Sequence, residues 1–212
     1  MPQKDDKFSE RPAVEDKNIL AMADRRASDR YRSVCRIARV RRASDAGLWL
    51  VRNISDKGMM LVANVALNGG EDVEIDLSDS ITISGRIVWS DKGRCGVVFS
   101  RKIDVAATLA ALAAEQRAEG YRALRLQVSA KAILALPSGA RPIDLVDISQ
   151  AGAGFHCETS LNPGSILNII LPGEDHPRCA LVRWSRELCG GLWFTTPLER
   201  AVLESVARFQ LD

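Results

Sequence analysis

The chain has 212 residues, of which 46% are hydrophobic and 26% charged, the composition of a globular protein with one or two domains. Its net charge of +2 excludes a strong overall field that would attract nucleic acid or a membrane surface. Five cysteines without a C-x-x-C pair indicate reduced thiols, which favours a cytoplasmic location. No apolar run reaches the ~18–20 residues of a membrane span. The polar start of the chain shows no signal peptide.

The first part of the chain is polar and then becomes strongly basic. Residues 1–22 mix Lys, Asp, Glu and Pro with few large apolar residues, so we expect a disordered tail. Residues 25–42 contain eight arginines and a single acid, Asp29. This basic segment leads directly into the first stretch with strand character.

Six short stretches up to residue 99 have the apolar composition or the period of two that is typical of half-buried strands. A polar turn, Asn53–Gly58, joins the second stretch to the third. Together they predict an antiparallel β-barrel. A helix is predicted at 104–119, because apolar residues recur at helical spacing, Asp104 can cap the start and Gly120 can end it. The predicted strands are 34–40, 47–52, 59–63, 72–77, 81–90 and 95–99.

The second half of the chain repeats the first, with most matched positions 94 or 95 residues apart. A repeat of this length indicates a duplicated domain, so we expect domains at 23–119 and 120–212. An amphipathic helix is predicted at 197–209, after a start signal at Thr196 and Pro197. Each barrel would then be followed by one α-helix. The strands predicted for the second copy are 126–136, 142–146, 153–157, 165–171, 179–184 and 191–194.

Two motifs of the first copy resemble the PilZ domain family. The arginines Arg26 and Arg30 stand four apart before the first strand, and Asn53, Ser55 and Gly58 form an [D/N]-x-S-x-x-G turn after the second strand. The resemblance covers nearly the whole chain after the tail and implies two tandem six-stranded antiparallel PilZ-like barrels. It also implies non-enzymatic binding of cyclic di-GMP, with no cofactor and no metal, and signalling to a protein effector.

The chemistry of that ligand suits these residue types. A guanidinium fork matches the O6 and N7 acceptors of guanine and also pairs with phosphate. By analogy with the family, Asn53 would bond a base or sugar and Ser55 a phosphate. Gly58 would permit a positive φ or a close backbone approach. Two further arginines, Arg25 and Arg32, are additional candidate contacts.

The second copy keeps only part of this pattern, so we expect it to bind cyclic di-GMP weakly or not at all. When Arg125 is aligned with Arg30, Tyr121 occupies the position of Arg26. The turn itself is intact. The residues of this weak second site are Arg125, Asp147, Ser149 and Gly152.

Other functions remain as alternatives. The main one is a ligand-independent adaptor whose degenerate PilZ folds serve protein interaction. A DNA or RNA binder is disfavoured because aromatic stacking residues are almost absent from the basic segment. A zinc site is disfavoured because His156 and the cysteines lack zinc spacing. The tryptophans Trp89, Trp184 and Trp193, together with Trp49, are expected in the core.

Overall fold

The computed structural model describes residues 31–136 and 139–210. The predicted tail and the candidate ligands Arg25, Arg26 and Arg30 therefore lie outside the described residues. So does the side chain of Arg32, although its backbone is described as part of a strand.

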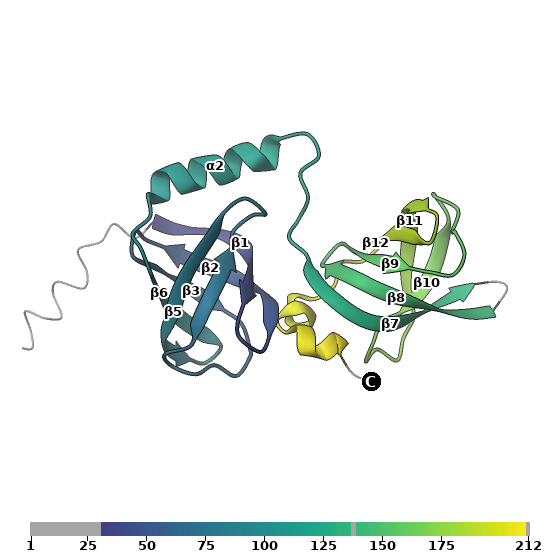
Figure 1. The fold of residues 1–212 in the computed structure, drawn as a ribbon, viewed down its shortest axis with the longest axis horizontal. Coiled ribbons are helices and arrows are strands. Elements are labelled where there is room, and N and C mark those ends of the chain that lie inside the picture. The colour runs from purple at the N-terminus through teal and green to yellow at the C-terminus, as the bar shows by residue number, and fades with distance from the viewer. Residues whose placement is uncertain (1–30, 137–138, 211–212) are drawn as a thin grey trace, which may run out of the picture.

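The first half of the chain forms a closed barrel of six antiparallel strands, as the sequence predicts (Figure 1). The strands are hydrogen-bonded in the order β1-β2-β3-β6-β5-β4, and β4 closes the barrel by pairing with β1. In β4, Val73 and Ile75 are buried while Glu74 is exposed, so the period of two places the apolar face inside. The strands are β1 (Tyr31–Arg41), β2 (Ala46–Ile54), β3 (Gly58–Val62), β4 (Asp72–Asp76), β5 (Thr82–Asp91) and β6 (Arg94–Phe99).

The helix α2 (Val105–Arg117) covers the first barrel and follows its last strand (Figure 1). The carboxylate of Asp104 caps its start by accepting a hydrogen bond from the backbone N–H of Ala107 at 2.9 Å. Its buried residues Val105 and Leu112 belong to the core of the first barrel. At the other end, the Glu115 carboxylate accepts a hydrogen bond from Ser80 in the β4–β5 loop. The helix therefore belongs to the first barrel.

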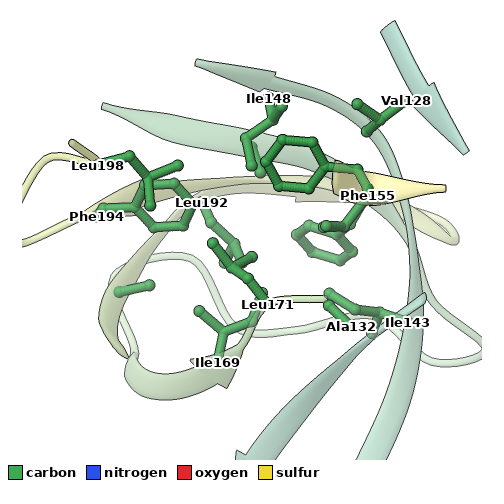
Figure 2. Close-up of a cluster of buried hydrophobic side chains, with 14 of the residues drawn as sticks. Val128, Ala132, Ile143, Ile148, Phe155, Ile169, Leu171, Leu192, Phe194 and Leu198 are labelled. Carbon is green, nitrogen blue, oxygen red and sulfur yellow. The ribbon is translucent and has the colours of Figure 1, made fainter. Parts of the chain in front are cut away.

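The second half forms a closed barrel with the same strand order as the first, β7-β8-β9-β12-β11-β10. The core residues labelled in Figure 2 come from its strands, from Leu171 directly after β10, and from the segment that follows the last strand, where Leu198 lies beside Phe194. The two copies therefore share one topology, which confirms the tandem barrels expected from the repeat. The strands are β7 (Leu126–Leu136), β8 (Gly139–Ser149), β9 (Gly152–His156), β10 (Ile166–Ile170), β11 (Arg178–Arg186) and β12 (Cys189–Phe194).

The prediction of an α-helix after the second barrel is wrong. Residues 197–209 form two short 3-10 helices instead, η2 (Arg200–Leu203) and η3 (Val206–Phe209). The predicted apolar positions Leu198, Val206 and Phe209 are buried, so burial was anticipated correctly although the helical path was not. An extended residue, Ser205 with φ −148° and ψ 133°, separates the two turns.

Hydrogen bonds to the first barrel explain why this segment is not an α-helix. The indole N–H of Trp49 donates to the backbone carbonyl of Glu204 at 2.8 Å, and the N–H of Val206 donates to the carboxylate of Asp45 at 3.1 Å. Both backbone groups would otherwise serve i→i−4 bonds within a helix. The Glu204 carboxylate also accepts from the N–H of Asn64 at 2.6 Å. The C-terminal turns therefore lie between the two barrels and hold them together (Figure 1).

The core assignment of three tryptophans is also wrong. The exposed fractions are 43% for Trp89, 47% for Trp184 and 46% for Trp193, whereas Trp49 is fully buried. The strand register shifts by one residue just before Trp89 and just before Trp184. A β-bulge of this kind adds one residue and reverses the inward and outward alternation that follows. Trp193 faces outwards because its neighbours Leu192 and Phe194 fill the core.

Candidate ligand-binding site

The strand register places the start of the described chain beside the Asn53–Gly58 turn. In the β1–β2 ladder, Tyr31 is paired with Ile54 and Arg32 with Asn53. The basic segment of the sequence therefore enters the barrel at the position where the polar turn leaves β2. The described chain therefore begins beside this turn, and the motif arginines Arg26 and Arg30 precede that start in the sequence, outside the described residues.

Hydrogen bonds hold the Asn53–Gly58 turn in one shape. Both the backbone N–H and the hydroxyl of Ser55 donate to the carbonyl of Gly58, at 2.8 and 3.1 Å. The N–H of Phe99 donates to the carbonyl of Lys57 at 2.8 Å, which ties the turn to the end of β6. The hydroxyl of Ser55 thus stabilises the turn by an internal hydrogen bond in this structure.

A close backbone approach accounts for the glycine of this turn. A Cβ built on Gly58 would overlap the backbone carbonyl oxygen of Val97 on the neighbouring strand β6. Gly58 does not have a positive φ, so the close backbone approach, and not an unusual backbone conformation, is the reason for glycine at this position. The same holds in the second barrel, where a Cβ on Gly152 would overlap the backbone carbonyl oxygen of Leu192. The hydroxyl of Ser149 also donates a hydrogen bond to the carbonyl of Gly152 at 3.1 Å.

One register row crosses five strands of the first barrel, beginning with the pair Arg32–Asn53, and adds a residue that the sequence reasoning missed. Asn53 is paired with Met60, Met60 with Gly96, and Gly96 with Trp89, so Trp89 lies on the same outward row as the turn. The indole of Trp89 covers Gly96, where any Cβ would collide with the ring. An exposed aromatic face beside a polar turn can stack on a purine base. The sequence carries one signal of this pairing, because in each copy a tryptophan stands seven residues before a strand glycine, Trp89 before Gly96 and Trp184 before Gly191.

The second barrel has the same row with different chemistry. Its members are Gln127, Asp147, Gly154, Gly191 and Trp184, paired in that order. The carboxylate of Asp147 takes the place of the Asn53 amide. It accepts a hydrogen bond from the guanidinium of Arg125 at 2.6 Å and another from the N–H of Gly154 at 2.8 Å. The four residues predicted for the second site are therefore brought together, with the arginine already paired.

The segment that carries Arg125 is also attached to the first barrel. The guanidinium of Arg39 on β1 donates to the backbone carbonyl of Arg125 at 3.0 Å. The same guanidinium pairs with Asp76 at 2.7 Å, and the Asp76 side chain is almost completely buried. The arginine segment of the second copy is therefore held between the two barrels.

The structure offers no alternative metal centre in the part of the chain that it describes, because no group of three or more His, Cys, Asp or Glu side chains converges there. The sulfur of Cys189 lies 3.2 Å from Nδ1 of His156, but no third His, Cys, Asp or Glu side chain of the described residues completes a metal site with them. Burial raises the pKa of the Cys95 thiol to about 11, so this cysteine stays protonated in the core. Among the described residues, no helix is long and apolar enough to cross a membrane.

Comparison with known proteins identifies the first barrel. The family model for the PilZ domain matches residues 24–115, which include β1 to β6 and most of α2. Residues 24–115 therefore match a PilZ domain, and the match does not extend to the second barrel. No curated protein sequence matches the chain.

Several solved structures are similar to the chain at low sequence identity. The PlzA protein of Borreliella burgdorferi in complex with c-di-GMP has 13% identity and a TM-score of 0.36, over 91% of this chain and 98% of that one. The inhibitor of motility MotI/DgrA of Bacillus subtilis has 13% identity and a TM-score of 0.32, over 78% and 90%. YcgR of Escherichia coli in complex with c-di-GMP has 11% identity and a TM-score of 0.29, over 91% and 85%.

Proposed function

We propose that the chain is a non-enzymatic cytoplasmic receptor that binds cyclic di-GMP at its first barrel and signals to a protein partner. The binding unit is residues 23–119, and residues 120–212 form the second unit. The observation that carries the proposal is the pairing of Arg32 with Asn53, which brings the basic segment to the polar turn within a PilZ domain.

Covalent connectivity limits how far the two motif arginines can be from the turn. Arg30 directly precedes Tyr31, whose partner in the ladder is Ile54. Arg26 is five residues before Tyr31, and five residues span at most ~18 Å when fully extended. Both guanidinium groups are therefore within reach of a nucleotide bound beside Asn53.

The ligand would be enclosed by groups of three kinds. Arg26 and Arg30 would pair with guanine edges and phosphates, with Arg25 and Arg32 as further cationic contacts. The amide of Asn53 would bond a base or sugar on the opposite side. Trp89 would stack on a base, and the turn closed by Ser55 and Gly58 would hold its shape during binding, which reduces the ordering cost.

The second barrel is expected to bind this ligand weakly or not at all. Its one motif arginine, Arg125, would have to leave the carboxylate of Asp147 before it could pair with a phosphate. A phosphate near Asp147 would also be repelled by that carboxylate. Tyr121 supplies no cation at the position of Arg26.

Calorimetry with cyclic di-GMP tests the proposal, with cyclic di-AMP and GMP as controls for the ligand. The wild-type chain should bind one class of tight site. Arg26→Ala/Arg30→Ala should weaken binding by about a hundredfold or more, because each charged group contributes about 1.5–3 kcal/mol. The matched variant Arg117→Ala/Arg208→Ala removes two exposed arginines elsewhere and should bind normally.

Two results would reject the site or the function. Unchanged affinity in Arg26→Ala/Arg30→Ala would reject the site. Failure of the wild-type chain to bind cyclic di-GMP at ~100 μM would mean that its binding free energy is weaker than about −5.5 kcal/mol. That result would favour the ligand-independent adaptor instead.

A further inference from the structure

An apolar row lies on the outer face of the second barrel. Ile166 on β10 is paired with Leu181 on β11, and Leu181 is paired with Trp193 on β12. The exposed fractions are 72% for Ile166 and 46% for Trp193, and Leu181 is half-buried. Trp184, exposed by 47%, opposes Gly191, two residues before Trp193 on β12, so the two indoles are diagonal neighbours. We call these four residues the β10–β12 face.

The duplication provides an internal comparison for this face. The register row of the first barrel that corresponds to Ile166–Leu181–Trp193 is Asp72–Arg86–Val98. There, Arg86 and Asp72 form an ion pair at 2.7 Å in which both side chains are well exposed. The pair lowers the pKa of the Asp72 carboxyl through a hydrogen bond from Arg86. The first barrel thus has an exposed ion pair at two of these three positions, whereas the second barrel has apolar side chains at all three.

Two exposed arginines border the β10–β12 face. Arg183 is the extra residue at the bulge before Trp184, and Arg186 follows on the same strand. Both are exposed, and among the described residues neither forms an ion pair, although Glu187 lies in the turn that follows Arg186. At the corresponding positions the first barrel has Val88 and Asp91, and Asp91 lies 4.0 Å from Arg94.

Exposed aromatic and arginine side chains of this kind are characteristic of protein-binding surfaces. Tryptophan and arginine dominate the binding energy of interfaces, and contiguous apolar patches on a soluble domain mark interaction sites. The strands of this face are internal members of a closed barrel, so the patch is not a sheet edge that awaits another strand. A partner must therefore bind through side chains.

We propose that the β10–β12 face is the docking surface for the protein partner, and that the partner presents large apolar side chains flanked by carboxylates. The apolar side chains cover Trp184 and Trp193, and the carboxylates pair with Arg183 and Arg186. The choice of an acidic partner rests on the charge of the two unpaired arginines. The identity of this face as the output surface rests on the proposed receptor function, whereas the docking contact itself does not.

Site-specific photo-crosslinking of the full chain in cells that produce it tests the proposal. The photoreactive residue p-benzoyl-phenylalanine is placed at position 193, and a matched chain carries it at position 98, the same position of the first barrel. We expect adducts from position 193 to a single protein, with the crosslinked peptide carrying carboxylates next to large apolar residues. Position 98 should give no such adduct.

Charge reversal distinguishes specific docking from nonspecific hydrophobic association. Arg183→Glu/Arg186→Glu should reduce the adduct yield at position 193 by about tenfold or more, because each charged contact contributes about 1.5–3 kcal/mol. Lys92→Glu, at the first barrel's hairpin turn, should leave the yield unchanged. A thermal unfolding midpoint equal to that of the wild type shows that each variant is folded.

Several outcomes would overturn the proposal. They are adducts at position 193 no stronger than at position 98, adducts to lipid, nucleic acid or a second copy of this chain, and adducts that survive the charge reversal. If the wild-type chain does not bind cyclic di-GMP in calorimetry but still gives the charge-dependent adduct at position 193, the receptor function is rejected and the docking surface stands.

Discussion

At the scale of single residues, Trp89 is the contact that the strand register adds to the site. It lies on the row of Asn53 and offers one face of its ring to solvent while the other covers Gly96. Stacking of an aromatic ring on a base contributes about 1–3 kcal/mol, so Trp89→Ala should weaken cyclic di-GMP binding by roughly 5- to 150-fold. Calorimetry measures this loss.

The duplicated fold supplies the control for that measurement. Trp184 covers Gly191 in the second barrel as Trp89 covers Gly96 in the first. Trp184→Ala should leave ligand affinity unchanged, because the second barrel is not the binding unit. Equal losses in Trp89→Ala and Trp184→Ala would mean that the ligand contacts both barrels, and the assignment of the site to the first would be wrong.

The position of Tyr121 decides whether the second barrel can bind. Tyr121→Arg restores two arginines four apart before β7 and supplies a cation that Asp147 does not already neutralise. We expect a second, weaker binding event to appear in the calorimetric titration of this variant. Tyr121→Lys is the control, since an ammonium lacks the planar fork that matches guanine. A titration of Tyr121→Arg with the stoichiometry of the wild type would contradict the prediction.

At the scale of elements, the sequence predicts the structure well where local patterns decide it. Alternation in β4 and the cap at Asp104 act locally, and the strands and the helix α2 lie where they were expected. The turn at Asn53–Gly58 was also found from its residues alone. The pairing of Arg32 with Asn53 beside that turn belongs to the β1–β2 ladder, which only the structure gives.

The elements that were predicted wrongly are those decided by distant partners. Residues 197–209 carry a helical pattern, but Trp49 and Asp45 of the first barrel bond the backbone of that segment and divide it into two turns. The bulges before Trp89 and Trp184 reverse the outward face within one strand. Neither a long-range hydrogen bond nor a single inserted residue alters the apolar period from which the elements were read.

At the scale of the whole molecule, the C-terminal turns make the two barrels dependent on each other. Their residues Leu203 and Phe209 are buried in the core of the second barrel, and Leu48 of the first barrel belongs to that same core cluster. A Cβ on Gly47 would overlap the carbonyl of Glu204, so the two surfaces meet at backbone distance. A change in the first barrel can therefore reach the second without passing through the long connection after α2.

The hydrogen bond between Trp49 and Glu204 tests this dependence. Trp49→Phe keeps an aromatic ring in the core but removes the buried indole donor, which leaves the Glu204 carbonyl without its 2.8 Å partner. An unsatisfied buried group costs about 1–3 kcal/mol, so urea unfolding should show a loss of stability of that size. Because Glu204 belongs to the second barrel's segment, amide hydrogen exchange should quicken in η2 and β7 as well as in β2. Trp184→Phe, an exposed substitution, should change neither quantity. Faster exchange confined to β2 would show that the barrels are stabilised separately, and coupling through the C-terminal turns would have to be abandoned.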